Sequence, residues 1–162
     1  MKRFFMITVA VLLTLSLISC SGTKQNKKNI IGTWRIIDSN GVEGALTVTF
    51  NEDGTYSYGF NSSLISDAAG DFSFDAFVNS SIIGDIAKKT GLSALLKSDT
   101  VKNLVEKLHD VAKLTYNIDN GKKMTVGISL LFGVINHDSS IEYSLNGDKL
   151  TFDGVNYIRI KD

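Results

Sequence analysis

The chain has 162 residues with 17 basic and 17 acidic side chains, so its formal net charge at pH 7 is zero. That balance lacks the basic excess of a nucleic-acid-binding surface, and we expect no nucleic-acid partner. The length is sufficient for one domain with a substantial hydrophobic core.

The first nineteen residues have the pattern of a signal peptide. Lys2 and Arg3 precede an apolar run over residues 4–18, which is too short for a comfortable membrane span. The run ends in Leu17-Ile18-Ser19-Cys20, which resembles the lipobox of bacterial lipoproteins. The resemblance implies cleavage after residue 19 and a diacylglyceryl group on Cys20. The alternative is an ordinary secretory signal, or an anchor helix, with an incidental cysteine.

Lipidation of Cys20 has two consequences. Because Cys20 is the only cysteine, the mature chain 20–162 would have no free thiol, which excludes disulfides, thiolate catalysis and cysteine metal sites together. Lipoproteins of this kind usually carry three acyl chains, palmitate among them, and three chains would hold the protein firmly on the membrane.

Residues 20–29 are predicted to be the lipidated cysteine and a flexible tether. No apolar residue follows Cys20 in this stretch, and its root-mean-square reach would be about 15–18 Å. Its three lysines are more typical of a solvated linker than of a contact with anionic head groups. No aspartate follows Cys20, which by the same resemblance favours the outer membrane, with the protein facing the periplasm.

From Ile30 onward, apolar residues alternate with polar ones, the pattern of half-buried strands. Trp34, the only tryptophan, lies in the first predicted strand, and a turn at residues 51–54 follows the second. The third strand contains Tyr56, and the fourth is expected to place Phe72, Phe74, Ala76 and Val78 on one face. Four strands in succession predict an antiparallel meander.

Residues 79–113 interrupt this pattern, and two short helices are predicted there. The first would bury Ile82, Ile83, Ile86 and Ala87. The second would have an apolar stripe of Val101, Leu104, Val105, Leu108 and Ala112. Because such a stripe has to be buried, we expect the second helix to cover one end or the open side of the sheet.

About five further strands are expected between Leu114 and Ile160, joined by glycine-containing turns. The predicted fold is mainly β: an antiparallel meander forming a barrel or half-barrel over residues 30–162, with two short helices inserted mid-sheet.

Both ends of this domain resemble lipocalin-like, or calycin-type, barrels. The resemblance rests on Gly32-Thr33-Trp34, on the turn 51–56, and on the ending 143–152 followed by Tyr157-Ile158-Arg159, as in small lipocalin-like lipoproteins of Gram-negative bacteria. It implies that Gly32, Trp34 and Arg159 close the barrel, with Arg159 stacked within about 6 Å of Trp34. The alternative is that Trp34 is an ordinary core residue and Arg159 is solvated. Lipocalins usually carry their main helix near the C-terminus, so the mid-sheet helices depart from the family pattern.

Rows of aromatic residues supply the candidate binding site. They could line a cavity in which tyrosine hydroxyls orient a ligand, or they could fill the core of a barrel that is only just wide enough to stay open. These residues are Tyr56, Tyr58, Phe60, Phe72, Phe74, Tyr116 and Tyr143.

No catalytic residue, metal site or cofactor is predicted. His109 and His137 each precede an aspartate, but neighbouring residues do not make a catalytic pair, and no nucleophile motif or phosphate loop occurs. The leading hypothesis is a non-enzymatic, lipid-anchored protein that binds a small apolar or amphipathic ligand. The alternative is a structural or protein-interaction lipoprotein with a filled barrel, which binds an envelope component rather than a ligand.

Overall fold

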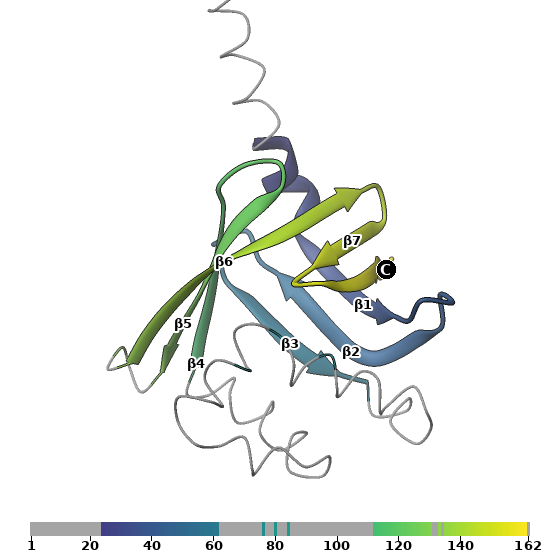
Figure 1. The fold of residues 1–162 in the computed structure, drawn as a ribbon, viewed down its shortest axis with the longest axis horizontal. Helices are drawn as coiled ribbons and strands as arrows, with labels where there is room; N and C mark the ends of the chain where they lie inside the picture. The colour runs from purple at the N-terminus through teal and green to yellow at the C-terminus, as the bar shows by residue number, and fades with distance from the viewer. Residues whose placement is uncertain are drawn as a thin grey trace, which may run out of the picture.

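The computed structural model describes residues 24–61, 76, 80, 84, 112–130, 133 and 135–161. These residues form eight antiparallel strands preceded by one helix over residues 24–30 (Figure 1). The strands are β1 (Gly32–Ile37), β2 (Glu43–Phe50), β3 (Tyr56–Phe60), β4 (Ala112–Ile118), β5 (Lys123–Leu130), β6 (Ile135–Asn146), β7 (Lys149–Phe152) and β8 (Val155–Arg159). The fold is therefore mainly β, as predicted.

The strands form one sheet in the order β3-β2-β1-β8-β7-β6-β5-β4. Every neighbour in this order is also consecutive in the chain, except that β8 returns to pair with β1. The two edge strands, β3 and β4, meet at a single bridge between Thr55 and Thr115, and the Tyr116 amide donates to the Gly54 carbonyl at 2.8 Å. The result is a nearly closed, barrel-like sheet with its seam between β3 and β4.

The alternating strand directions place the connections at two ends. The helix end contains residues 24–31, the turns 51–54, 119–122 and 147–148, and the end of β8. The opposite end contains the connections 38–42 and 153–154, together with the last residues of β3 and β5 and the first residues of β4 and β6. In Figure 1 the purple helix lies beside the green turn between β4 and β5.

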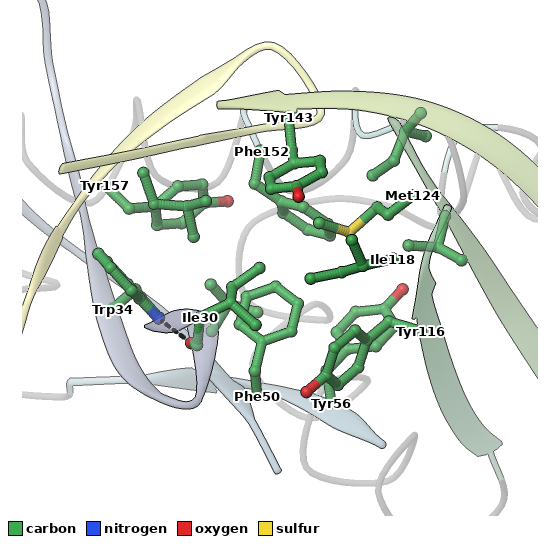
Figure 2. Packing of buried hydrophobic residues seen from close by; sticks show 14 of the residues in the cluster. Ile30, Trp34, Phe50, Tyr56, Tyr116, Ile118, Met124, Tyr143, Phe152 and Tyr157 are labelled. Carbon is green, nitrogen blue, oxygen red and sulfur yellow. Dashed lines mark hydrogen bonds between the residues drawn. The ribbon is translucent and has the colours of Figure 1, made fainter. Parts of the chain in front are cut away.

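The core lies inside the barrel because alternate residues of each strand point inward. Phe50 is near its centre, with its ring 5.0 Å from that of Tyr116 and 5.2 Å from that of Phe152, both edge-to-face (Figure 2). The largest side chains with less than 2% exposure are Ile30, Trp34, Ile36, Leu46, Val48, Phe50, Met124, Leu150 and Phe152. These residues belong to one continuous core inside the barrel.

The structure corrects three local predictions. Residues 24–29, expected to belong to a flexible tether, are helical. Ala76, expected in a fourth strand, is also helical, so the described strands before the seam are three. Ala112, expected to end a helical stripe, instead begins β4, and the five strands β4 to β8 match the number predicted for this half. Of the two inserted helices, the structure describes only Ser80 and Gly84, which is helical; the stripe from Val101 to Leu108 lies outside the described residues.

Candidate functional site

The helix end is closed by Trp34, Arg159 and the last turn of the helix. The Arg159 guanidinium carbon lies 4.0 Å from the Trp34 ring centroid, so the contact predicted between the two side chains is confirmed. Arg159 also donates to the Ile31 carbonyl at 2.8 Å and to the Asn29 carbonyl, while the Trp34 indole donates to the Ile30 carbonyl at 2.7 Å (Figure 2). The last carbonyls of a helix have no hydrogen-bond donor within the helix itself, and Arg159 and Trp34 supply the donors here.

Gly32 makes room for this arrangement. Its φ is +123°, which L side chains rarely adopt, and a β-carbon there would lie 2.8 Å from Nη1 of Arg159. Glycine is therefore required both by the backbone and by the guanidinium above it.

All five tyrosines of the chain pack in or against the core, and they divide into two groups. In the first group the hydroxyls bind turns at the helix end. Tyr116 donates to the Asn51 carbonyl at 2.9 Å, and Tyr143 donates to the Asn120 carbonyl at 3.0 Å. The Tyr143 hydroxyl also accepts a hydrogen bond from Asn26 of the helix at 3.1 Å. Tyr116 and Tyr143 therefore hold turns and helix together, and their hydroxyls are not available to a ligand.

The second group is Tyr56 and Tyr58 on β3 with Tyr157 on β8. The rings of Tyr56 and Tyr58 meet edge-to-face at 5.7 Å, and the ring of Phe152 on β7 contacts both strands, with its centroid 5.9 Å from that of Tyr56 and 6.4 Å from that of Tyr157. Figure 2 shows the Tyr157 hydroxyl directed toward the middle of the buried hydrophobic residues that it draws. We call these three residues the tyrosine cluster.

Removal from water raises the pKa of each hydroxyl in the tyrosine cluster well above the usual value of 10.0. The negative charge of Asp153, in the turn between β7 and β8, raises these pKa values further. All three hydroxyls are neutral at physiological pH, as tyrosines ordinarily are, and burial keeps them protonated to a higher pH than exposed tyrosines.

Two buried hydroxyls in this region lack hydrogen-bond partners. Tyr56 is only 3% exposed and Ser80 only 5% exposed, yet neither side-chain oxygen has a partner among the residues that the structure describes. Ser80 lies close enough to Tyr58 to offset part of the rise in the pKa of that tyrosine, although the geometry falls short of a hydrogen bond. An unpaired buried hydroxyl costs about 1–3 kcal/mol, so the protein retains these groups at a cost in stability.

His137 and Ser139 on β6 form a polar pair inside the barrel. They stand directly opposite the buried residues Ile128 and Val126 in the β5–β6 ladder and therefore share their inward face. The imidazole Nε2 of His137 lies 3.1 Å from the Ser139 hydroxyl. Asp138 points to the other face of the strand, so it does not complete a catalytic arrangement with this pair. Among the described residues, no three His, Cys, Asp or Glu side chains gather as a metal site.

The remaining predicted candidates fall into two groups. Phe60 packs against the core at the end of β3 but is only partly buried. Phe72, Phe74 and His109 lie outside the described residues, as does Cys20. Sequence reasoning missed Tyr157 and the pair His137–Ser139, although the alternation of Tyr157 with Arg159 is visible in the sequence.

Comparison with known proteins gives no match to a protein-family model, to a curated protein or to a solved structure. Within the part of the chain that the structure describes, no helix has the length and apolar character needed to cross a membrane.

Proposed function

We propose that this protein is a lipid-anchored, lipocalin-like envelope protein whose barrel binds a small apolar or amphipathic molecule at the tyrosine cluster. The observation that carries the proposal is the unpaired hydroxyl of Tyr56, buried among aromatic rings with a proton to donate. A bound molecule with a hydrogen-bond acceptor would supply the missing partner.

The same site favours a particular ligand chemistry. The aromatic walls suit an apolar body, and the neutral hydroxyl of Tyr56 suits an acceptor such as a carbonyl, an ether or a hydroxyl group. An anionic group is less suitable because the Asp153 charge acts on this hydroxyl. We therefore propose a ligand whose polar group is neutral.

The lipocalin-like assignment is supported by three features of the barrel. The strands run in chain order, β8 returns to β1, and the Trp34–Arg159 contact closes the helix end. The lipobox-like residues 17–20 support a diacylglyceryl anchor on Cys20, and the absence of a following aspartate supports an outer-membrane position facing the periplasm. We propose no enzymatic activity, since the sequence has no nucleophile motif and no phosphate loop.

The alternative is a structural or protein-interaction lipoprotein with a filled barrel. The dense packing around Phe50 favours it, because the rings of Tyr116 and Phe152 both lie against Phe50, which is itself only 1% exposed. In that case the tyrosine cluster would simply complete the core, and the partner would be a protein or another envelope component.

Native mass spectrometry of the freshly purified full chain in mild detergent separates these functions. Ligand binding predicts a non-covalent adduct in addition to the lipid mass on Cys20, released by organic solvent for identification. Cys20→Ser is the control, which should keep the adduct and lose the lipid. A lipidated chain without any adduct would favour the filled barrel, and an unlipidated wild-type chain would contradict the anchor.

A further inference from the structure

We propose that the helix end of the barrel lies against the membrane and that its lysines contact anionic phospholipid head groups. This inference rests on the lipid anchor at Cys20 in the proposed function. It concerns which face of the protein the membrane meets, which the anchor alone does not specify.

The first argument is the length of chain between the anchor and the barrel. The helix begins at Lys24 and is fixed to the barrel through Asn26 and through the carbonyls that Arg159 and Trp34 bind. From Cys20 to Lys24 an extended chain spans at most about 14 Å, whereas a chain without the helix could span at most about 36 Å from Cys20 to Ile30. The helix therefore brings the barrel close to the bilayer and directs its helix end toward it.

The second argument is the distribution of charge between the two ends. We compare the charges of the helix end with those of the opposite end. For this comparison the helix end comprises residues 24–32, 51–54, 119–123, 142–149 and 159–161. The opposite end comprises residues 35–43, 112–113, 130, 133, 135–138 and 152–155. Among these described residues the helix end has eight basic and five acidic side chains, while the opposite end has two basic and four acidic ones. The end that the anchor brings to the membrane is thus the one suited to an anionic surface.

Five exposed lysines form the surface in question, which we call the basal lysines: Lys24, Lys27, Lys28, Lys122 and Lys123. None of them forms an ion pair with a residue that the structure describes. The Asn26–Tyr143–Asn120 hydrogen bonds join the helix to the turn 119–122, so the two groups of lysines lie on one rigid surface. Charges on such a surface act on head groups within a Debye length, about 8 Å at physiological ionic strength.

The carboxylates at this end limit the effect without reversing it. Asp148 is bound by Lys161 at 2.6 Å and lies 3.6 Å from Arg159, so these three charges largely compensate one another. Asp119 accepts hydrogen bonds from Asn117 and Thr125 and lies beside the basal lysines, as does Glu142 opposite Lys123. Glu52 and Asp53 are in the separate turn 51–54.

Energy transfer to head-group-labelled lipids tests the proposal with the full lipidated chain in vesicles of phosphatidylcholine, with or without phosphatidylglycerol. Lipidation consumes the Cys20 thiol, so a fluorophore can be attached to Ser144→Cys near the helix end or to Ser39→Cys at the opposite end, both exposed positions. The two ends are separated by about six residues of strand, roughly 20 Å, so we expect transfer from residue 144 to exceed that from residue 39 by about twofold or more.

Charge reversal tests the role of the lysines. Lys122→Glu combined with Lys123→Glu is expected to reduce the difference in energy transfer between the labels at residues 144 and 39 in phosphatidylglycerol vesicles. Added salt should reduce the same difference in the wild type. Val42→Glu, which adds a negative charge at an exposed position in the connection 38–42 of the opposite end, is the control and should leave the difference unchanged. Equal or reversed transfer in the wild type, or no effect of the double variant, would overturn the proposal.

The intact mass of the same sample shows whether Cys20 is lipidated. A missing lipid contradicts the anchor and this inference together, whereas a lipidated chain with equal transfer contradicts this inference alone.

Discussion

The guanidinium of Arg159 lies 4.0 Å from the centroid of the Trp34 ring and also binds the carbonyl of Ile31. One side chain from the last strand thus holds the first strand and the end of the helix that precedes it. The two residues are directly paired in the β1–β8 ladder, the pairing that joins the beginning of the sheet to its end. The closure of the barrel at this end depends on this contact.

Replacement of Arg159 by alanine is expected to destabilise the protein by about 2–4 kcal/mol, through lost cation–π stacking and lost charge-assisted hydrogen bonds. Arg35→Ala is the matched control, because its side chain has the same 23% exposure but forms a surface ion pair with Glu43. Such pairs contribute about 0–1 kcal/mol. Urea unfolding followed by the fluorescence of Trp34, the only tryptophan, measures both. Equal losses for the two variants would contradict the role given to Arg159.

Gly32→Ala is expected to destabilise the protein more than Gly41→Ala. Both glycines have positive φ, +123° and +82°, so both variants strain the backbone by about 1 kcal/mol or more. Only at residue 32 would the new methyl group displace Arg159, since nothing lies within 4 Å of a β-carbon at residue 41. Unfolding midpoints of the two variants give the comparison, and a Gly32→Ala midpoint equal to that of Gly41→Ala would show that Arg159 adjusts without loss.

The two groups of tyrosines should respond differently to removal of the hydroxyl. Tyr116→Phe removes a bonded hydroxyl and leaves the Asn51 carbonyl with only the hydrogen bond from the Gly54 amide, which is expected to cost about 1 kcal/mol. Tyr56→Phe removes a hydroxyl without a partner among the described residues and is expected to leave the stability of the ligand-free protein unchanged or higher. Thermal unfolding of delipidated, ligand-extracted samples tests this, and a larger loss for Tyr56→Phe would reveal a partner for that hydroxyl.

Stability should fall at alkaline pH. The pKa values of Tyr56, Tyr58 and Tyr157 are raised in the folded protein, so the unfolded chain loses these protons first as the pH rises. Their contribution is complete below pH 10.0, the unfolded value, and decreases above it by up to about 1.4 kcal/mol per pH unit for each tyrosine. Unfolding should therefore accompany the ultraviolet signal of tyrosinate formation. Titration of all five tyrosines near pH 10 in a folded protein would contradict the burial of the cluster.

The strands of the barrel could be predicted because each buries one face, and this leaves a two-residue period in the sequence. The helix over residues 24–30 could not, because it has no apolar face apart from Ile30. It is held by contacts with Trp34, Arg159 and Tyr143, which come from distant strands. Ala76 was predicted in a strand because a short apolar run fits both the two-residue period of a strand and the 3.6-residue period of a helix. The predicted burial of the stripe from Val101 to Leu108 stays a prediction.

The candidate site was predictable in kind but not in detail. The alternation of apolar and polar residues identifies the tyrosines that face inward, but it does not show which hydroxyls form hydrogen bonds with a turn. Tyr116 and Tyr143 differ from Tyr56 only because the turns 51–54 and 119–122 place carbonyls beside them. The sequence shows only that His137 precedes an aspartate, whereas in the structure β6 begins at Ile135 and places this histidine on the inner face of the barrel.

The occupancy of the barrel in Tyr56→Phe tests ligand binding most directly. Native mass spectrometry should show an adduct on the wild-type chain. The variant should bind it about tenfold more weakly, because one hydrogen bond to the ligand contributes about 1–1.5 kcal/mol. Tyr143→Phe, whose hydroxyl binds the turn and the helix, is the control and should keep the adduct. An adduct that Tyr56→Phe retains at wild-type affinity, or a wild-type chain with no adduct at all, would contradict ligand binding at the tyrosine cluster.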